Sequence, residues 1–222
     1  MKMKQKMKIE VWSDTMCPFC YLGKNNYESA LKVFEHSENV ELVWHSFQLN
    51  PDFPDQTPER VSYYQYLADI KDLSYEQAKK LLNGIVDIAK KAGLNYNLDK
   101  AAMFNSMDVH RIIQKAKSKE LADKAEERMF HAFFTEGEYL NDRGTLEKLG
   151  NEIGLTSEEV DDALSNEMYA YLVKQDMQEA ANRGIDTVPT FVFNEKYSVI
   201  GAQPSEVFLE TLQKSYEEYI NL

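Results

Sequence analysis

The only two cysteines of this chain stand in one tetrapeptide, Cys17-Pro18-Phe19-Cys20, where one periodic pattern gives way to another. From Lys8 to Trp12, polar and apolar side chains alternate, which is typical of a half-buried strand. After the tetrapeptide, apolar side chains recur near helical spacing from Leu22 to Phe34, and Pro18 suits the first position of a helix. The tetrapeptide is therefore predicted to lie at a strand-to-helix junction.

The rest of the chain predicts an α/β protein with a large helical insertion. Residues 39–47 alternate again as a strand, and ligands of such a strand-helix-strand unit gather beyond the carboxyl ends of its strands. Residues 52–182 are predicted to be helical. A capping box is expected at Ser74, and another helix is expected to open at Thr156 and to continue toward Gly184. A hairpin of residues 190–193 and 197–201 and a helix from residue 205 follow.

This order, β-α-β, then helices, then β-β-α, matches a thioredoxin-like fold whose two halves flank an insertion. We expect residues 1–51 and 183–222 to form the thioredoxin-like domain and residues 52–182 to form the inserted helical domain.

Composition excludes several classes of function. Lys and Arg number 25 against 37 Asp and Glu, a formal net charge of −12, which disfavours nucleic acid and anionic membrane surfaces as partners. The start of the chain lacks the apolar core of a secretory signal, and no apolar run reaches the roughly 18 residues of a membrane span. We therefore expect a cytoplasmic protein.

The cysteine pair is predicted to act chemically rather than as a structural link. In a reducing compartment a structural disulfide is disfavoured, and so short a loop would constrain the unfolded chain very little. Backbone N–H groups at a helix N-terminus would favour a thiolate on Cys17 by about 0.3–1 kcal/mol. Cys20, one helical turn later, is placed to resolve a mixed disulfide, and Phe19 is expected to be exposed beside a reactive, exposed sulfur.

A metal site is not expected at this tetrapeptide. A structural zinc ion needs four ligands, usually supplied as two closely spaced pairs. The four histidines of the chain show no H-x₃₋₅-H spacing, so the cysteine pair favours redox chemistry over metal binding.

Several segments resemble the DsbA-like branch of the thioredoxin superfamily, and within it the FrnE-like proteins, which stand near the 2-hydroxychromene-2-carboxylate isomerases. The similarity covers nearly the whole chain in the right order. The matching segments are residues 14–23 and 47–51, Asn105-Ser106 with His110-Arg111, and residues 184–191.

The resemblance implies roles for residues near the end of the insertion. Pro189 would be a cis-proline facing the cysteines, although local statistics favour a trans bond. The backbone of Val188, with Thr187 beside it, would pair with an extended substrate segment. Phe19 stands where the family commonly has Trp, which leaves the substrate preference open.

Other candidate residues have two interpretations each. Asp14 either takes the proton of Cys20 through water or braces the strand-to-helix turn. His110 and Arg111 either line a groove above the cysteines, as the resemblance implies, or form a bonded polar helix face. The aromatic and Met side chains near residues 63–66 and 103–107 either contact substrate or, as is commoner for such patterns, form core.

Together these features predict a thiol-disulfide oxidoreductase or isomerase acting on protein or peptide disulfides. Cys17 would be the nucleophile and Cys20 the resolving thiol. No cofactor is required, and glutathione is a candidate redox partner. Two alternatives stay open, a glutathione-dependent isomerase or transferase for a small aromatic substrate and a redox-independent chaperone.

Overall fold

The computed structural model of the chain describes residues 6–55 and 59–221. Contacts divide the chain into two compact units. The sheet unit contains the described residues up to Phe47 and from Asp176 onward, and the helical unit contains the described residues from Gln48 to Gln175. The sequence predicts these boundaries after residues 51 and 182 instead.

The sheet unit is built on four strands in the order β2-β1-β3-β4. β1 is parallel to β2 and antiparallel to β3, and β4 is antiparallel to β3. A short 3₁₀ turn, Ser37–Asn39, precedes β2. The strands are β1 (Met7–Ser13), β2 (Val40–Ser46), β3 (Thr190–Phe193) and β4 (Tyr197–Ile200). The predicted α/β, thioredoxin-like arrangement with a helical insertion is confirmed.

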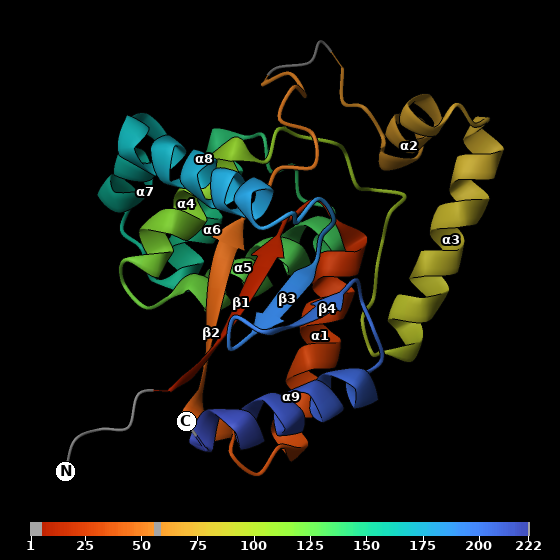
Figure 1. The fold of residues 1–222 in the computed structure, drawn as a ribbon. Coiled ribbons are helices and arrows are strands. Elements are labelled where there is room, and N and C mark those ends of the chain that lie inside the picture. Colours follow the sequence, from red (N-terminus) through yellow and green to blue (C-terminus); the bar gives the residue numbers. More distant parts are fainter. Residues whose placement is uncertain (1–5, 56–58, 222) are drawn as a thin grey trace. The chain divides into compact units, whose positions relative to one another are not determined.

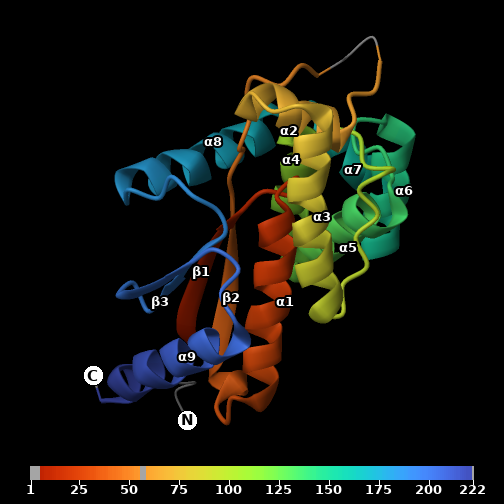
Figure 2. The ribbon, with the colours of Figure 1, turned by 90° about the vertical axis from the view of Figure 1, so that its right-hand side faces the viewer.

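One face of this sheet packs against α1 (Pro18–Val33) and α9 (Ser205–Ile220), which Figures 1 and 2 show together beside the strands. Tyr27 of α1 stacks on Phe191 of β3 with ring centroids 5.6 Å apart. Phe208 of α9 meets the same Phe191 ring edge-on at 4.9 Å. Such aromatic side chains each bury about 150–250 Å², so this cluster fixes α1, and with it the cysteines at its start, against the sheet.

The opposite face carries the end of α8 (Glu167–Asn182). Because side chains alternate along a strand, Trp12 points away from α1, and its ring stacks on that of His45 at 4.4 Å. Trp12 Nε1 donates a hydrogen bond to the carbonyl of Asp176, and Ser46 N donates one to its carboxylate. These bonds explain why the sheet unit begins again at Asp176 rather than at residue 183.

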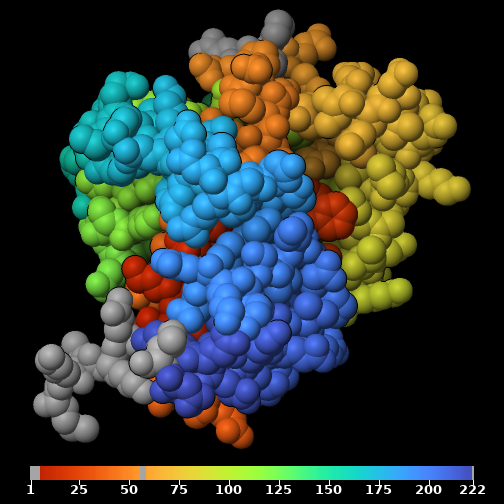
Figure 3. All heavy atoms as spheres, viewed as in Figure 1, coloured from red at the N-terminus to blue at the C-terminus, as the bar shows by residue number. Residues whose placement is uncertain are grey.

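The β3–β4 hairpin turns through two residues with positive φ, Asn194 at 48° and Glu195 at 57°. Turns of this hand match the twist of the flanking strands. Lys196 N closes the turn with a hydrogen bond to Phe193 O at 3.0 Å. In Figure 3, the blue atoms of the C-terminal residues form one continuous surface over this part of the sheet unit.

The helical unit contains most of the remaining helices. The predicted capping box at Ser74 with Gln77 is confirmed, and the structure shows a second one at Thr156 with Glu159. Among the helices of the described ranges, none is long and apolar enough to cross a bilayer. The elements are α2 (Tyr63–Lys71), α3 (Tyr75–Lys91), α4 (Met107–Lys117), α5 (Ala122–His131), a π-helical turn (Ala132–Glu136), α6 (Arg143–Ile153) and α7 (Ser157–Ser165).

The prediction of one helix from Thr156 toward Gly184 is wrong, because the chain breaks at Asn166. Asn166 leaves the helical region with φ −88° and ψ 114°. Its backbone N–H closes α7 on Asp162 O, and its side-chain oxygen accepts from Met168 N at 3.0 Å at the start of α8. Asn side chains compete with the backbone in this way at helix ends.

The aromatic and Met side chains singled out in the sequence mostly form the core of the helical unit. Tyr63, Met103 and Phe104 are buried. Phe133 packs against Phe104 at 5.0 Å and against Tyr63 at 6.0 Å. The commoner interpretation of this pattern, as core, therefore holds for these residues.

Candidate functional site

The cysteine tetrapeptide lies between β1 and α1, as its sequence context predicts. Cys17 is the N-cap of α1, with φ −89° and ψ 114°, and Pro18 occupies the first helical turn. Cys20 N donates to Cys17 O at 3.0 Å, which closes that turn. Cys17 therefore lies at the positive end of a 16-residue helix.

Asp14 shapes the turn that leads to Cys17. It is fully buried, and its Oδ1 accepts a hydrogen bond from Met16 N at 3.2 Å, while its carbonyl accepts from Cys17 N at 3.0 Å. This is the bracing contact that the structural interpretation of Asp14 expects.

The two sulfurs are free thiols, and both are buried. The side chain of Cys17 is 4% exposed, so the prediction of an exposed sulfur is wrong. The sulfur lies 3.7 Å from the carbonyl oxygen of Val188. Val188 follows Cys17 by 171 residues, so spacing along the sequence did not reveal this contact. The residue that the resemblance assigns to substrate pairing thus lies over the nucleophile.

Burial raises the pKa of the Cys20 thiol well above its usual value. The neighbouring Cys17 adds to the shift through a hydrogen bond and through charge repulsion. Smaller contributions from the backbone of Asp14 and the side chain of Ser13 act in the opposite direction without reversing it. Cys20 therefore holds its proton at neutral pH, as a resolving thiol does until a base removes it.

The loop before β3 lies next to the cysteines and α1. The Val188–Pro189 bond is cis, as the resemblance implies and against the local expectation. Thr190 Oγ1 donates to Thr187 O at 2.6 Å, which links the two ends of the loop. A Cβ placed on Gly23 of α1 would come within 2.9 Å of Pro189 Cγ, so a glycine at this position lets the helix approach the loop closely.

Phe19, between the cysteines, is 40% exposed, as expected. Thr187 is also exposed, whereas Val188 is buried. The sheet unit therefore offers an apolar ring and a polar side chain near the buried sulfurs.

His110 and Arg111 belong to α4 of the helical unit, and both are buried. Arg111 Nε donates to Ala163 O at 3.0 Å, and Nη2 donates to the Glu167 carboxylate at 3.1 Å. These contacts fit the bonded polar face that the sequence offered as one interpretation. Their assignment to a substrate groove stays a prediction.

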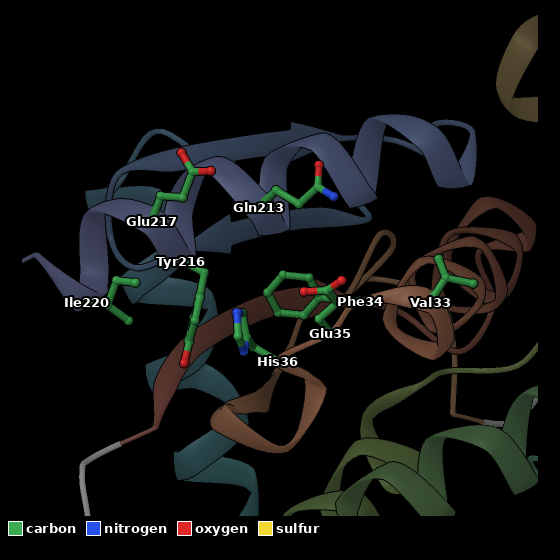
Figure 4. Close-up of a pocket in the computed structure, with 8 residues that line it drawn as sticks. All are labelled: Val33, Phe34, Glu35, His36, Gln213, Tyr216, Glu217 and Ile220. Carbon is green, nitrogen blue, oxygen red and sulfur yellow. The ribbon is translucent and has the colours of Figure 1, made fainter.

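A separate cavity of about 310 Å³ lies at the other end of α1 (Figure 4). In it, His36 stacks on Tyr216 of α9 with ring centroids 4.6 Å apart. With about 1.5 Å of rise per residue, the 16 residues of α1 separate this end from Cys17 by roughly 24 Å. The cavity therefore lies apart from the cysteine site. Its lining residues are Val33, Phe34, Glu35, His36, Gln213, Tyr216, Glu217 and Ile220.

Sequence reasoning missed two groups of charged side chains in the sheet unit. Lys24 is buried in α1, four residues after Cys20, and pairs with Glu28. The i,i+4 spacing of this pair was a usable signal. The second group gathers around His45 and Asp176, which are 131 residues apart, so local spacing carried no signal for it.

Comparisons with known proteins agree with this geometry. The profile of the DSBA-like thioredoxin domain family matches residues 8–213. A crystal structure of a probable DsbA oxidoreductase from Streptomyces coelicolor is 33% identical with a TM-score of 0.89, covering 96% of this chain and 91% of that chain. The uncharacterized protein YwbO of Bacillus subtilis is 29% identical over 203 residues, covering 90% of this chain and 92% of YwbO.

Two more distant structures share the fold. The cytosolic disulfide reductase DsbM from Pseudomonas aeruginosa, solved with GSH, has 18% identity and a TM-score of 0.64, covering 97% of this chain and all of that chain. A 2-hydroxychromene-2-carboxylate isomerase has 14% identity and a TM-score of 0.71, covering 97% of this chain and 98% of that chain.

Proposed function

The chain belongs to the DSBA-like thioredoxin domain family, and from this premise we propose that it is a thiol-disulfide oxidoreductase acting on protein or peptide disulfides. The observation that carries the proposal is the position of Cys17. It caps α1 at a strand-to-helix junction, and its sulfur lies 3.7 Å from the backbone carbonyl of Val188. A helix N-terminus stabilises the thiolate that disulfide exchange requires.

In the reducing direction, the Cys17 thiolate attacks one sulfur of a substrate disulfide. A mixed disulfide forms, and the other substrate sulfur leaves as a thiolate. Cys20 then loses its proton and attacks Cys17 Sγ, so that the Cys17–Cys20 disulfide forms and the second substrate thiolate leaves. Two electrons pass from the dithiol to the substrate, and the oxidising direction is the reverse of these steps.

Asp14 is our candidate for the base that accepts the Cys20 proton. Because burial raises the pKa of Cys20, resolution needs such an acceptor close to the sulfur. Asp14 is buried, and its backbone lies close enough to lower the Cys20 pKa slightly. A carboxylate in this turn can take the proton through a water molecule.

Substrate binding is assigned to the loop before β3 and to Phe19. An extended segment of the substrate would pair with the backbone of Val188, with Pro189 and Thr187 shaping the loop, and the exposed Phe19 ring would contact apolar substrate side chains. Since Cys17 is 4% exposed, the sulfur has to be uncovered before it reacts. His110 and Arg111 are secondary candidates for substrate contact.

No cofactor is needed for this exchange, and glutathione is our candidate for recycling the enzyme. Two molecules of the reduced tripeptide would return the Cys17–Cys20 disulfide to the dithiol and leave as one glutathione disulfide. The solved complex of DsbM with GSH supports this partner through shared fold alone.

The proposal is tested by trapping the mixed disulfide on the full chain. We expect the Cys20→Ser variant, incubated with insulin, to accumulate a covalent adduct on Cys17 that mass spectrometry detects and dithiothreitol releases. The matched Cys17→Ser variant should accumulate at most a tenth as much. No adduct on Cys20→Ser, together with no insulin reduction by the parent protein, would refute the proposal.

The shared fold of the isomerase supports one alternative, a glutathione-dependent isomerase of a small aromatic substrate. Such an activity would survive in the Cys20→Ser variant, since it needs no resolving thiol. Disulfide exchange with full turnover would be lost in the same variant, because it needs Cys20. The remaining alternative, a chaperone, predicts that suppression of insulin-chain aggregation survives substitution of both cysteines.

A further inference from the structure

A second cluster of titratable side chains lies on the face of the sheet away from α1, and the proposed exchange makes no use of it. His45 of β2 places Nδ1 3.0 Å from Asp176 Oδ1. One ligand atom from each of His45, Asp176 and Glu179 lies within 4.8 Å of the other two. We propose that this cluster binds a divalent transition-metal ion, for which Zn²⁺ is the natural probe.

The charges of the cluster favour a cation. Three carboxylates, those of Glu10, Asp176 and Glu179, gather around His45. Arg183 contributes one guanidinium, 2.8 Å from Glu10 and 2.6 Å from Glu179. The side chains of Glu10 and Asp176 are each only 13% exposed. Carboxylates held close together with little access to water repel one another, and a divalent cation offsets that repulsion.

The orientation of the His45 ring is that of a metal ligand. The ring is 9% exposed and is held by its stacking on Trp12. Its Nε2 is buried and makes no hydrogen bond within the described ranges, yet Glu10 Oε1 lies 3.3 Å away. A metal on Nδ1 fixes the ring proton on Nε2, the nitrogen that lies 3.3 Å from Glu10 Oε1. A carboxylate behind the histidine in this way is the usual second contact of metal-binding histidines.

The distances are close to those that a bound ion requires. Two ligand atoms about 2.1 Å from a zinc ion lie at most about 4.2 Å apart. The 3.0 Å between His45 Nδ1 and Asp176 Oδ1 already satisfies this limit. Glu179 can close the remaining gap, because its side chain is the most exposed of the three, at 41%, and Arg183 bonds its Oε1. Ser46 N meanwhile holds Asp176 by Oδ2 at 2.9 Å.

Nitrogen and carboxylate ligands together suit Zn²⁺ and its neighbours in the first transition series rather than Mg²⁺ or Ca²⁺. An ion bound here would join β2 directly to the end of α8, two segments 131 residues apart. The site lies wholly within the sheet unit.

The test uses the full chain with Cys17→Ser and Cys20→Ser, so that the thiols cannot bind the ion. Isothermal titration calorimetry with ZnCl₂ near neutral pH should show one saturable site per chain. Co²⁺ should quench the fluorescence of Trp12, whose ring lies 4.4 Å from that of His45. In this background, His45→Gln and Glu179→Gln should each weaken Zn²⁺ binding at least about tenfold, and Glu10→Gln by about tenfold through loss of the second contact.

His36→Gln is the matched control, since His36 is exposed at the end of α1, and it should bind Zn²⁺ like the background protein. Circular dichroism checks that each variant is folded. If His45→Gln unfolds, Glu179→Gln still tests the proposal, because Glu179 is only half-buried and its substitution should not unfold the protein. Absence of saturable binding overturns the proposal, as does equal affinity in Glu179→Gln and the background. A midpoint of thermal unfolding that does not change when Zn²⁺ is added also overturns it.

Discussion

Replacing Gly23 by alanine should not stabilise the sheet unit, although the same change in an ordinary helix interior stabilises a protein. A Cβ on Gly23 would lie 2.9 Å from Pro189 Cγ, 3.4 Å from Phe191 Cε2 and 3.6 Å from the backbone of Ala202. The first distance is too short for carbon atoms, so α1 or the loop at Pro189 has to shift. Overpacking of this kind costs about 1–3 kcal/mol, whereas the gain in helix propensity is about 1 kcal/mol.

Gly84 of α3 is the matched control, because a Cβ there meets nothing within 4 Å. Gly84→Ala should raise the free energy of unfolding of the helical unit by about 1 kcal/mol. Gly23→Ala should leave that of the sheet unit unchanged or lower it by up to about 2 kcal/mol. Because propensity is common to both, the difference between the two variants measures the overpacking.

The assay is urea unfolding followed by two signals. Both tryptophans, Trp12 and Trp44, belong to the sheet unit, so their fluorescence reports the unit that contains Gly23. Far-ultraviolet circular dichroism reports the helices, including α3. If Gly23→Ala raised the fluorescence midpoint as much as Gly84→Ala raises the dichroism midpoint, the close approach of α1 to Pro189 would be refuted.

Three further predictions concern protons and hydrogen bonds. Burial raises the pKa of Cys20, so the folded state keeps this proton after the unfolded chain has lost its own. The free energy of unfolding should therefore keep its full value at neutral pH and fall above about pH 8.5, by up to about 1.4 kcal/mol per pH unit. Urea unfolding of Cys20→Ser should lack this fall. An equal fall in the variant would contradict the raised pKa of Cys20. Asp14→Asn keeps the acceptor for Met16 N but cannot take a proton, so we expect insulin reduction to slow at least about tenfold with little change in unfolding free energy; an unchanged rate would leave Asp14 a structural brace. The side chain of Asn105 forms hydrogen bonds with Phe53 O, Asp55, Gln48 and Met107 N. Asn105→Ala should therefore lower the free energy of unfolding of the helical unit by about 2–4 kcal/mol, as measured by urea unfolding. A change under about 0.5 kcal/mol would show that these hydrogen bonds make no net contribution.

Features encoded by neighbouring residues were predictable from the sequence. The periodicity around β1 and α1, the capping box at Ser74 and the hairpin at Asn194 each depend on side chains within a few positions. Such short-range patterns depend on the segment itself, so the sequence of the segment is enough to predict its secondary structure. The same reasoning placed the cysteines correctly at the helix start.

Features that depend on distant partners were not predictable. The cover over Cys17 comes from Val188, and the cluster around His45 is completed by Asp176. The break at Asn166 had a local cause, but a single Asn inside a helical pattern does not reveal whether its side chain will cap a new helix. Residues so far apart in the sequence are brought together only when the sheet unit folds.

The contact between Cys17 and Val188 also has a consequence for the growing polypeptide. The two residues are separated by 171 positions, so the carbonyl that shields the sulfur is synthesised long after the sulfur itself. At about 5–20 residues per second, a ribosome needs roughly 9–34 s to synthesise that interval. During this time Val188 cannot cover the sulfur of a newly made molecule, so the dithiol gains its native shield only after the last strands are translated.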